Sequence, residues 1–376
     1  MVSRVLEVNV DDIGYGGVFS LVKNVIENKP ESLEIDIAAI EKFENPNNIS
    51  LLKTFGTNVY YVGKTSNKAL KQVYTFVNLR KIIKEYSFDC VHIHADTANK
   101  LLISGLAAKT SGVKKIILHS HASGVDGKNR AFKKIIHYIC RPLLKYIGTT
   151  FVACSDLAEA WMFPNISKSQ IVEIKNGIDL KKFEFNSIVR DYERKQLKVQ
   201  PKELLIGHVG RFAYQKNHEF LIEIMKKMKE KKIDAKLLLV GEGPKFADIR
   251  QLSKNQKLED RIIFYGISNN VCQLYQAMDI FVLPSHFEGL PIVGVEAQAS
   301  GVKTIFSNEI TKEAALLPST KFLPISGVNA IDQWVDEILR GCESDRTKAV
   351  EYIKNQKFDI SDTIQSFINL YTGTNR

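Results

Sequence analysis

The stretch Pro284–Gly301 reads PSHFEGLPIVGVEAQASG, and it follows the short apolar run Asp279–Leu283, DIFVL. A short run of β-branched and aromatic residues predicts a buried strand. Proline favours the first turn of a helix and glycine favours its C-terminal cap, so we expect a helix from Pro291 to Ser300. The order strand, loop, helix predicts an α/β fold with this loop at the edge of a sheet.

Two glutamates lie in this stretch, eight residues apart. Glu288 falls in the loop, and Glu296 falls inside the expected helix among valines and alanines. A carboxylate in apolar surroundings is costly unless something hydrogen-bonds to it. A ligand rich in vicinal hydroxyls would satisfy it. The alternative is a glutamate that is exposed to solvent or paired with an arginine.

The second half of the chain opens on a similar pattern. Leu204–Val209 predicts a strand, the following GRF a turn, and Glu219–Lys229 a helix, with Asn217 as its N-cap. Arg211 and Lys216 then lie at the positive end of this helix, where cations are disfavoured by up to about 1 kcal/mol. A bound diphosphate removes that conflict, because it accepts hydrogen bonds from both cations and from backbone amides. Two solvated cations are the alternative.

These motifs resemble those of the retaining GT-B glycosyltransferases of family four (glycosyl transferases group 1), of the type that builds exopolysaccharides and capsules. The two glutamates match the E-x7-E element, GRF…QKN is similar to the diphosphate-binding pattern, and VGEGP matches a glycine loop of the family. The resemblance is densest over residues 207–301. The residues that it places at the donor are Gly16, Gly17, Gly210, Arg211, Lys216, Gly241, Glu242, Gly243, Glu288, Gly289, Leu290, Pro291 and Glu296.

The first half of the chain alternates strands and helices, as in a parallel sheet covered on both faces. Two of the expected strands end in paired histidines, His92 with His94 and His119 with His121. Ligands bind at such strand ends, and the resemblance implies that His121, with His119 as the fallback, touches the donor sugar. Satisfied core histidines are the alternative. Zinc is disfavoured because no acidic residue shares a usable motif with them.

A glycine-rich loop follows the first expected strand. Gly14-Tyr15-Gly16-Gly17 does not fit G-x-G-x-x-G, so a dinucleotide site is disfavoured. The resemblance implies that Gly16 and Gly17 face the donor, and a plain tight turn is the alternative.

Residues 128–145, KNRAFKKIIHYICRPLLK, predict a basic amphipathic helix that Pro142 ends near Arg141. One face carries the apolar residues Phe132, Ile135, Ile136, Ile139 and Leu143. The basic residues gather opposite. Such a helix is a candidate for contact with an anionic membrane surface. An ordinary domain helix with a solvated basic face is the alternative.

The composition restricts the class of protein and its partners. A chain of 376 residues favours two domains, and a net charge of +10 favours acidic partners. We expect no nucleic acid, because no nucleic-acid-binding motif occurs. Five widely spaced cysteines argue against a disulfide framework and a zinc site. With neither a signal peptide nor an uninterrupted apolar span, we expect a cytoplasmic protein, peripheral on the inner face of the membrane.

We expect two Rossmann-like domains that face an interdomain cleft. The first, over 1–185, takes the acceptor. A linker spans 186–202, and the domain over 203–357 binds the nucleotide-sugar. The helix expected within 358–376 crosses back onto the first domain, as the resemblance implies.

The resemblance implies transfer of a hexose or N-acetylhexosamine from a nucleoside-diphosphate sugar, UDP above all, to a saccharide acceptor that is carried on a lipid. Arg211, Lys216, His121 and Glu288 would act in catalysis. No cofactor or metal is expected, since no convincing D-x-D motif occurs. The alternatives are a nucleotide-sugar 2-epimerase of the same fold and a non-catalytic partner subunit of a glycosyltransferase pair.

Overall fold

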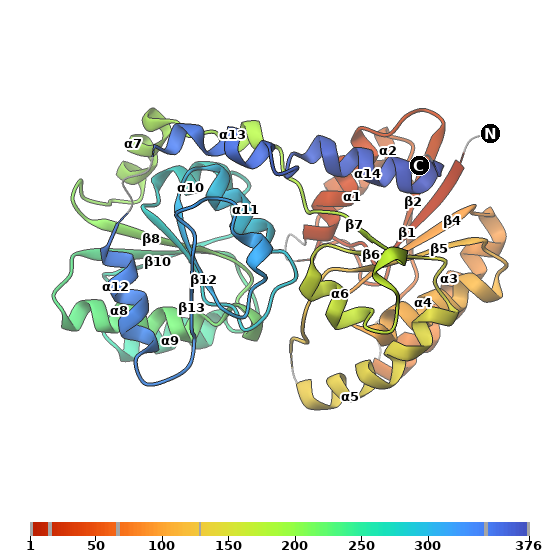
Figure 1. The fold of residues 1–376 in the computed structure, drawn as a ribbon, viewed down its shortest axis with the longest axis horizontal. Coiled ribbons are helices and arrows are strands. Elements are labelled where there is room, and N and C mark those ends of the chain that lie inside the picture. Colours follow the sequence, from red (N-terminus) through yellow and green to blue (C-terminus); the bar gives the residue numbers. More distant parts are fainter. Residues whose placement is uncertain (1–2, 14–16, 65–67, 128, 342–344, 374–376) are drawn as a thin grey trace. The chain divides into compact units, whose positions relative to one another are not determined.

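The computed structural model describes residues 3–13, 17–64, 68–127, 129–341 and 345–373. The chain forms two compact units, Met1–Asn176 with Ile360–Arg376, and Gly177–Asp359. Each unit is built around a parallel β-sheet with helices packed on it (Figure 1). The predicted class, α/β with two Rossmann-like domains, is confirmed.

Within the described residues, the sheet of the first unit has the strand order β3-β2-β1-β4-β5-β6-β7. Its strands are β1 (Ser3–Val8), β2 (Leu33–Ala39), β3 (Val59–Tyr61), β4 (Cys90–Ala95), β5 (Lys115–Ser120), β6 (Thr150–Ala153) and β7 (Ile171–Glu173). Its α-helices are α1 (Gly17–Glu27), α2 (Pro46–Thr54), α3 (Lys68–Tyr86), α4 (Ala98–Thr110), α5 (Arg130–Cys140), α6 (Asp156–Met162) and α14 (Ile360–Thr372). Short 3-10 helices cover Arg141–Tyr146 and Lys168–Gln170.

Alternation along the strands divides the core of this unit into two layers. Val91 on β4 and Leu118 on β5 pack with α3 and α4. Cys90 and Ile117 face the opposite side, against α1 and α14. Since successive side chains of a strand point to opposite faces, His92 and His94 lie on the same face as Cys90.

The C-terminal helix α14 closes the first unit. Its Phe367 and Tyr371 are buried in the same layer as α1, and the helix contacts both α1 and β1. A segment from the far end of the sequence therefore completes the core that begins with β1.

In the second unit the described strands have the order β10-β9-β8-β11-β12-β13. These strands are β8 (Leu204–Val209), β9 (Ala235–Val240), β10 (Ile262–Gly266), β11 (Ile280–Leu283), β12 (Lys303–Ser307) and β13 (Lys321–Leu323). The α-helices are α7 (Ser187–Gln196), α8 (His218–Glu230), α9 (Phe246–Asn255), α10 (Val271–Ala277), α11 (Ile292–Ala299), α12 (Ala330–Leu339) and α13 (Ala349–Lys354). Short 3-10 helices cover Leu180–Phe183, Tyr214–Lys216, Lys312–Ala314 and Arg346–Lys348.

Two expectations about this unit are wrong. The unit begins at Gly177, not at residue 203, and the linker expected over 186–202 contains α7, which packs against α10. Asn186 caps α7 by accepting hydrogen bonds from two backbone amides, so this charged stretch folds as a helix.

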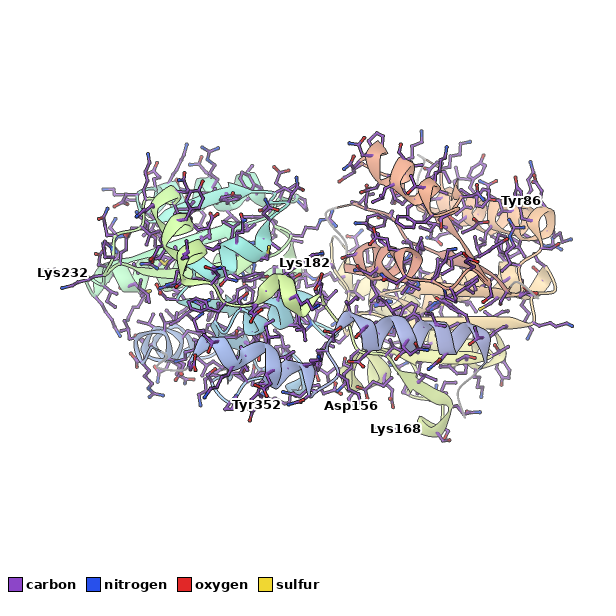
Figure 2. All side chains as sticks on the ribbon, turned by 90° about the horizontal axis from the view of Figure 1, so that it is seen from above. Tyr86, Asp156, Lys168, Lys182, Lys232 and Tyr352 are labelled. Carbon is purple, nitrogen blue, oxygen red and sulfur yellow. The ribbon has the colours of Figure 1, made fainter. Side chains whose placement is uncertain are left out.

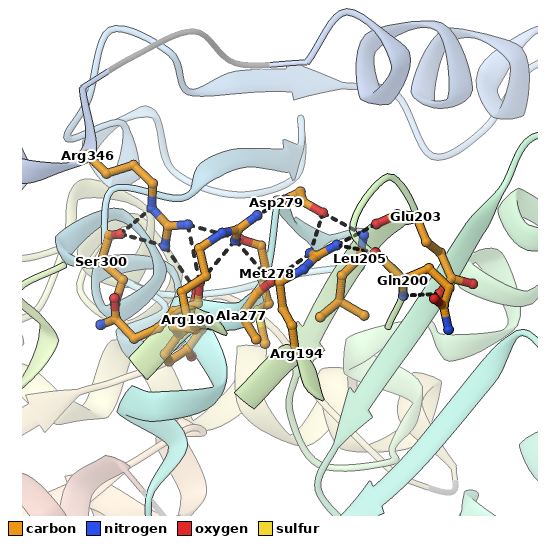
Figure 3. A network of polar contacts seen from close by, with 12 residues as sticks. Arg190, Arg194, Gln200, Glu203, Leu205, Ala277, Met278, Asp279, Ser300 and Arg346 are labelled. Carbon is orange, nitrogen blue, oxygen red and sulfur yellow. Dashed lines mark hydrogen bonds and ion pairs between the residues drawn. The ribbon is translucent and has the colours of Figure 1, made fainter. Parts of the chain in front are cut away.

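A network of arginines holds the start of β11 (Figure 3). The carboxylate of Asp279 pairs with Arg190 and, at 2.9 Å, with Arg194, and it accepts a hydrogen bond from the Leu205 amide at 2.7 Å. Arg346 donates to the carbonyls of residues 275, 276, 278 and 300, where α10 and α11 end. Carbonyls at helix ends lack intrahelical partners, so the three arginines stabilise the ends of α10 and α11 and the residue that precedes β11.

The basic composition is expressed at the surface. Lys168, Lys182 and Lys232 are exposed and extend from the two units (Figure 2). Among the described residues, no helix combines the length and the apolar character that crossing a membrane requires.

Candidate active site

Three loops of the second unit meet at the carboxyl ends of adjacent strands. They follow β8, β9 and β11, and the strand order reverses between β8 and β11. In open parallel sheets, ligands bind outside the carboxyl ends of the strands at such a reversal. Arg211, Glu242 and Glu288 all lie in these loops, and Lys216 ends the short 3-10 helix after β8.

Two glycines let the loops after β8 and β9 approach closely. Gly241 has φ +134°, and a Cβ atom there would lie 2.3 Å from the Gly210 carbonyl oxygen. At Gly243 a Cβ atom would lie 2.6 to 2.9 Å from the Phe212 backbone. The Phe212 amide donates to the Glu242 carbonyl at 2.9 Å, so the two loops are joined by their backbones. The side chain of Glu242 is exposed.

Lys216 and Glu288 form an ion pair across two loops. Lys216 Nζ lies 2.7 Å from Glu288 Oε1, and Gln215 Nε2 donates to Glu288 Oε2 at 2.9 Å. Glu288 is only 6% exposed, so these donors offset the cost of burying its carboxylate. The loop between Lys216 and α8 is tied to β11 as well, since Asn217 Nδ2 donates to the Pro284 carbonyl at 3.0 Å.

Asn217 does not cap α8 as we expected. It occupies the N-cap position, but its φ of 54° and ψ of 50° are left-handed and its side chain makes no capping hydrogen bond. Asparagine adopts this conformation more readily than most residues. Arg211 nearby is exposed, and no described residue forms an ion pair or hydrogen bond with its side chain. A guanidinium without protein partners can donate two parallel hydrogen bonds to one phosphate or carboxylate group.

Glu296 lies on α11 in apolar surroundings, as the sequence indicated. The helix spans Ile292–Ala299 with Pro291 at its N-cap and Gly301 beyond its end at φ +68°, so the predicted helix is confirmed within one residue at each end. Tyr275, which is fully buried, donates its hydroxyl to Glu296 Oε2 at 2.9 Å. Burial raises the pKa of Glu296 to about 7, against the hydrogen bond from Tyr275 and the charge of Lys216.

Most of the loop after β11 is buried, with His286 and Phe287 partly exposed. Gly289, Leu290 and Pro291 are covered, and the His286 amide donates to the Gln215 carbonyl at 2.8 Å. The rings of His286 and Tyr214 stack with centroids 4.2 Å apart. This loop is therefore held in place by the segment that carries Lys216.

In the first unit, His121 ends a chain of hydrogen bonds. Its Nε2 lies 2.8 Å from His94 Nδ1, and His94 Nε2 lies 2.7 Å from Glu7 Oε2. No acidic residue shares a sequence motif with these histidines, but the fold places one beside them. Glu7 on β1 stands in register with His92 on β4 and is fully buried.

His92, His94 and His119 form a buried cluster. Nitrogen atoms of all three rings lie within 4.8 Å of one another, so this set could hold a metal ion. Two of these nitrogens contact each other, His92 Nε2 and His119 Nδ1 at 3.1 Å, and His92 Nδ1 lies 2.7 Å from the Tyr371 hydroxyl. Hydrogen bonds within the cluster therefore account for its close packing.

The expected glycine loop is described only in part. Gly17 begins α1 and is exposed, and Gly16 lies outside the described residues. Gly17 and His121 belong to the first unit, and the other described residues that we predicted at the donor belong to the second.

Sequence reasoning missed residues that contact the predicted site residues. In the second unit these are Gln215 and Tyr275, and in the first unit Glu7 contacts His94 and is in turn bonded by Tyr371. A glutamate in the middle of the apolar strand VLEVNV was a signal for Glu7, because a buried carboxylate needs partners. The other three partners come from segments far apart in sequence, and no local pattern identifies them.

Two Rossmann-like sheets, one of which carries cations and buried carboxylates on the loops at its strand ends, define a protein of the GT-B architecture. Residues 189–356 match the family described as Glycosyl transferases group 1, and residues 41–182 match Glycosyltransferase Family 4. EpsF of Bacillus subtilis (strain 168), which carries the name of a glycosyltransferase, is 31% identical over 98% of this chain and 96% of its own length. The chain belongs to the glycosyltransferases of this family.

Two further proteins are similar to this chain. The UDP-Gal:alpha-D-GlcNAc-diphosphoundecaprenol alpha-1,3-galactosyltransferase of Escherichia coli is 25% identical over 72% of this chain and 70% of its own length. The crystal structure of Anabaena Alr3699/HepE in complex with UDP and glucose has a TM-score of 0.77 at 16% identity, and the match covers 99% of this chain and 100% of that one. The second likeness shows the fold alone.

Proposed function

We propose that this glycosyltransferase moves a hexose or an N-acetylhexosamine from a UDP-sugar to a saccharide acceptor that is carried on a lipid, with retention of the anomeric configuration, in bacterial exopolysaccharide or capsule synthesis. The name of the Escherichia coli relative states a UDP-galactose donor and an acceptor linked to diphosphoundecaprenol. That likeness supports a UDP-sugar and a lipid-linked saccharide for this chain.

The observation that carries the proposal is the arrangement of cations beside α8. Lys216 is held by Glu288 at 2.7 Å, and Arg211 is exposed without a described partner. When the bond between the anomeric carbon and the donor phosphate breaks, negative charge develops on the departing diphosphate. Fixed cations and helix amides stabilise that charge more than they stabilise the bound donor. In this proposal they replace a metal ion.

The remaining residues take the sugar and the ribose. Glu296 accepts hydrogen bonds from the ribose hydroxyls, and Glu288 and His121 contact the donor sugar. The acceptor oxygen forms its bond to the anomeric carbon on the face that the diphosphate leaves. A donor phosphate oxygen takes the acceptor's proton, so no side chain needs to act as base or nucleophile.

The structure of α5 supports contact with an anionic membrane surface through residues 128–145, of which Lys128 lies outside the described residues. The apolar face of this helix is turned outward, because Phe132 is 63% exposed, Ile135 56% and Ile139 66%. An ordinary domain helix would bury these side chains. Lys134 and Lys145 are exposed with them, and basic residues near an anionic surface contribute about 1 kcal/mol each. We propose that the protein is peripheral on the inner face of the membrane.

The test of the proposed function is the thermal stability of the purified protein with a panel of UDP-, GDP- and ADP-sugars, with EDTA present throughout. Saturation at a hundred times the dissociation constant stabilises a fold by about 2.7 kcal/mol, so the true donor should stand out. The donor so identified is then incubated with a lipid-linked saccharide, and NMR of the product reports the anomeric configuration. No stabilisation by any nucleotide-sugar, or an inverted product, would overturn the proposal.

A further inference from the structure

Four histidines and one glutamate form a continuous polar network on one face of the first sheet. Glu7, His92, His94 and His119 are each at most 1% exposed, and His121 at the end of β5 is half-buried. Phe367 and Tyr371 of α14 cover the network, with the Phe367 ring 5.3 Å from His92. Most buried polar groups are hydrogen-bonded, so the contacts of His94 and His121 show where their protons lie. Among the described residues, His119 Nε2 is buried without a hydrogen-bond partner.

The carboxylate of Glu7 fixes the protons of the chain that leads to His121. Burial alone raises the pKa of Glu7, but the His92 and His94 rings beside it outweigh that effect and hold it well below its ordinary value. A carboxylate only accepts hydrogen bonds, so His94 Nε2, 2.7 Å away, carries a proton. Burial and the neighbouring His92 ring lower the pKa of His94 to about 4, so its ring is neutral near pH 7 and Nδ1 is an acceptor.

The same logic extends one residue further. His121 Nε2 lies 2.8 Å from the unprotonated His94 Nδ1, so His121 Nε2 carries a proton. Burial and the His94 ring keep the pKa of His121 below its ordinary value, so this ring is neutral as well. Its remaining nitrogen, Nδ1, is then an acceptor, and no described residue hydrogen-bonds to it.

We propose that Glu7 and His94 are positioning residues, which orient His121 so that its Nδ1 atom accepts a hydrogen bond from a hydroxyl group of the donor sugar. This role rests on the proposed function, in which His121 contacts that sugar. His121 Nδ1 accepts a hydrogen bond and cannot donate one. The site therefore selects a sugar with a hydroxyl group at this position over a sugar whose substituent there has no hydrogen to donate. A site built for one hydrogen bond discriminates strongly against analogues that lack it.

The other oxygen of Glu7 provides a matched control within the same network. The Tyr371 hydroxyl donates to Glu7 Oε1 and accepts from His92 Nδ1. Tyr371→Phe therefore removes one hydrogen bond from this carboxylate and leaves the bond between Glu7 and His94 in place. In Glu7→Gln the side-chain amide has one oxygen, which accepts, and one NH2 group, which donates. Only one of the two donors to residue 7, the Tyr371 hydroxyl or His94 Nε2, can then keep its acceptor.

Nitrogen-15 NMR of the histidine rings tests the inference without any substrate. We expect His94 and His121 of the wild-type protein to be neutral with the proton on Nε2, and Tyr371→Phe to leave both unchanged. In Glu7→Gln, either these two rings switch together to the Nδ1–H tautomer or His92 switches to Nε2–H. Wild-type rings with the proton on Nδ1, a switch of His94 without His121, or stoichiometric bound zinc would overturn the inference.

Kinetics with fluorinated UDP-sugars test the link to the substrate, because fluorine at one ring position cannot donate a hydrogen bond. In the wild-type enzyme and in Tyr371→Phe, fluorine at one position should lower kcat/KM by roughly 100-fold or more, whereas His121→Ala should lose that discrimination. Equal discrimination by wild-type and His121→Ala enzymes would overturn the substrate contact. An inactive wild-type enzyme would instead contradict the proposed function, and the NMR result would still decide the proton positions.

Discussion

Glu288 and Glu296 belong to one sequence motif but lie in opposite environments. Glu288 accepts hydrogen bonds from Lys216 and Gln215, at 2.7 and 2.9 Å. Among the described residues, the one donor to the Glu296 carboxylate is the neutral Tyr275 hydroxyl, and burial raises the pKa of Glu296 to about 7. The first carboxylate is satisfied by the protein, whereas the second stays under-satisfied until a ligand donates to it. This difference supports the ribose role that we propose for Glu296.

Donor binding should therefore depend on pH through Glu296. Two ribose hydroxyls donate to the ionised carboxylate better than to the acid, and the pKa of about 7 places the change near neutrality. Between about pH 8 and pH 6 the ionised fraction falls roughly tenfold, and we expect the dissociation constant of the UDP-sugar to rise by a similar factor. Calorimetric titration at several pH values measures this, and a flat profile would contradict the ribose role.

The variant Glu296→Gln provides the control for this prediction. It should bind the donor weakly and without the pH dependence.

The stability of the protein should depend on pH through the same residue. The pKa of Glu296 in the folded protein is raised above the ordinary value of 4.5, so the folded state binds the proton more tightly than the unfolded state. The free energy of unfolding therefore falls as pH rises from about 4.5 to above 7. Relative to the variant, the wild-type protein should lose about 1 to 3 kcal/mol over that range in denaturant titrations.

Lys216 should matter to both catalysis and folding. We expect Lys216→Met to lower kcat roughly 100-fold or more, because a fixed cation no longer faces the leaving diphosphate. It also leaves Glu288, which is 6% exposed, without its ion-pair partner, at a cost of about 1 to 3 kcal/mol. The sequence does not show this second cost, because the ion pair joins two loops that are distant along the chain.

A double variant separates the two effects of Lys216. Lys216→Met with Glu288→Gln removes the buried charge that Lys216 balanced, so thermal unfolding should return toward the wild-type midpoint. Turnover should stay low, because the cation at the diphosphate and the carboxylate at the sugar are both lost. Lys227→Met is the matched control, since this lysine pairs with Asp332 at 3.1 Å on the surface and should affect neither property. Turnover that recovered with stability would show that Lys216 has only a structural role.

Helices and strands were predicted correctly from the sequence where periodicity and terminal residues determine them. The strand at Leu204–Val209 and the helix that carries Glu296 lie where periodicity and terminal residues placed them. Predictions failed where tertiary contacts decide. The charged stretch that contains α7 is a helix because Arg190 and Arg194 on that helix bind Asp279 and the carbonyls before β11. No pattern within that stretch indicates those distant partners.

The arginine network should contribute measurably to the stability of the second unit. Arg346→Lys keeps the charge but cannot reach the four carbonyls at the ends of α10 and α11, because an ammonium lacks the planar fork of a guanidinium. We expect a loss of about 2 to 4 kcal/mol in denaturant unfolding. Arg340→Lys is the control, since Arg340 pairs with Glu337 at the surface, where its side chain is 74% exposed. Equal losses in both variants would contradict a specific role for the network.

The surface of the whole molecule differs from its core in two properties that the sequence only suggests, its positive charge and the apolar face of α5. The net charge is +10, and lysines such as Lys168 and Lys232 are exposed. The apolar side chains of α5 lie outside the core of the first unit. A helical wheel shows that such a helix is amphipathic, but it does not show which face packs. The structure resolves this, because His137 is the buried residue of α5 and stacks on Trp161 with centroids 3.9 Å apart.

Vesicle binding tests the role of α5 in the full-length protein. We expect binding to vesicles rich in phosphatidylglycerol, weak binding to phosphatidylcholine, and release by salt, since screening weakens exposed charges. The variant Ile135→Ser/Ile139→Ser keeps every charge and should bind roughly tenfold or more weakly, because apolar area inserted into the interface contributes about 25 cal/mol per Å². Both side chains are more than half exposed, so the melting temperature should not fall. A large fall in melting temperature with unchanged vesicle binding would show that this face packs within the protein and does not bind a membrane.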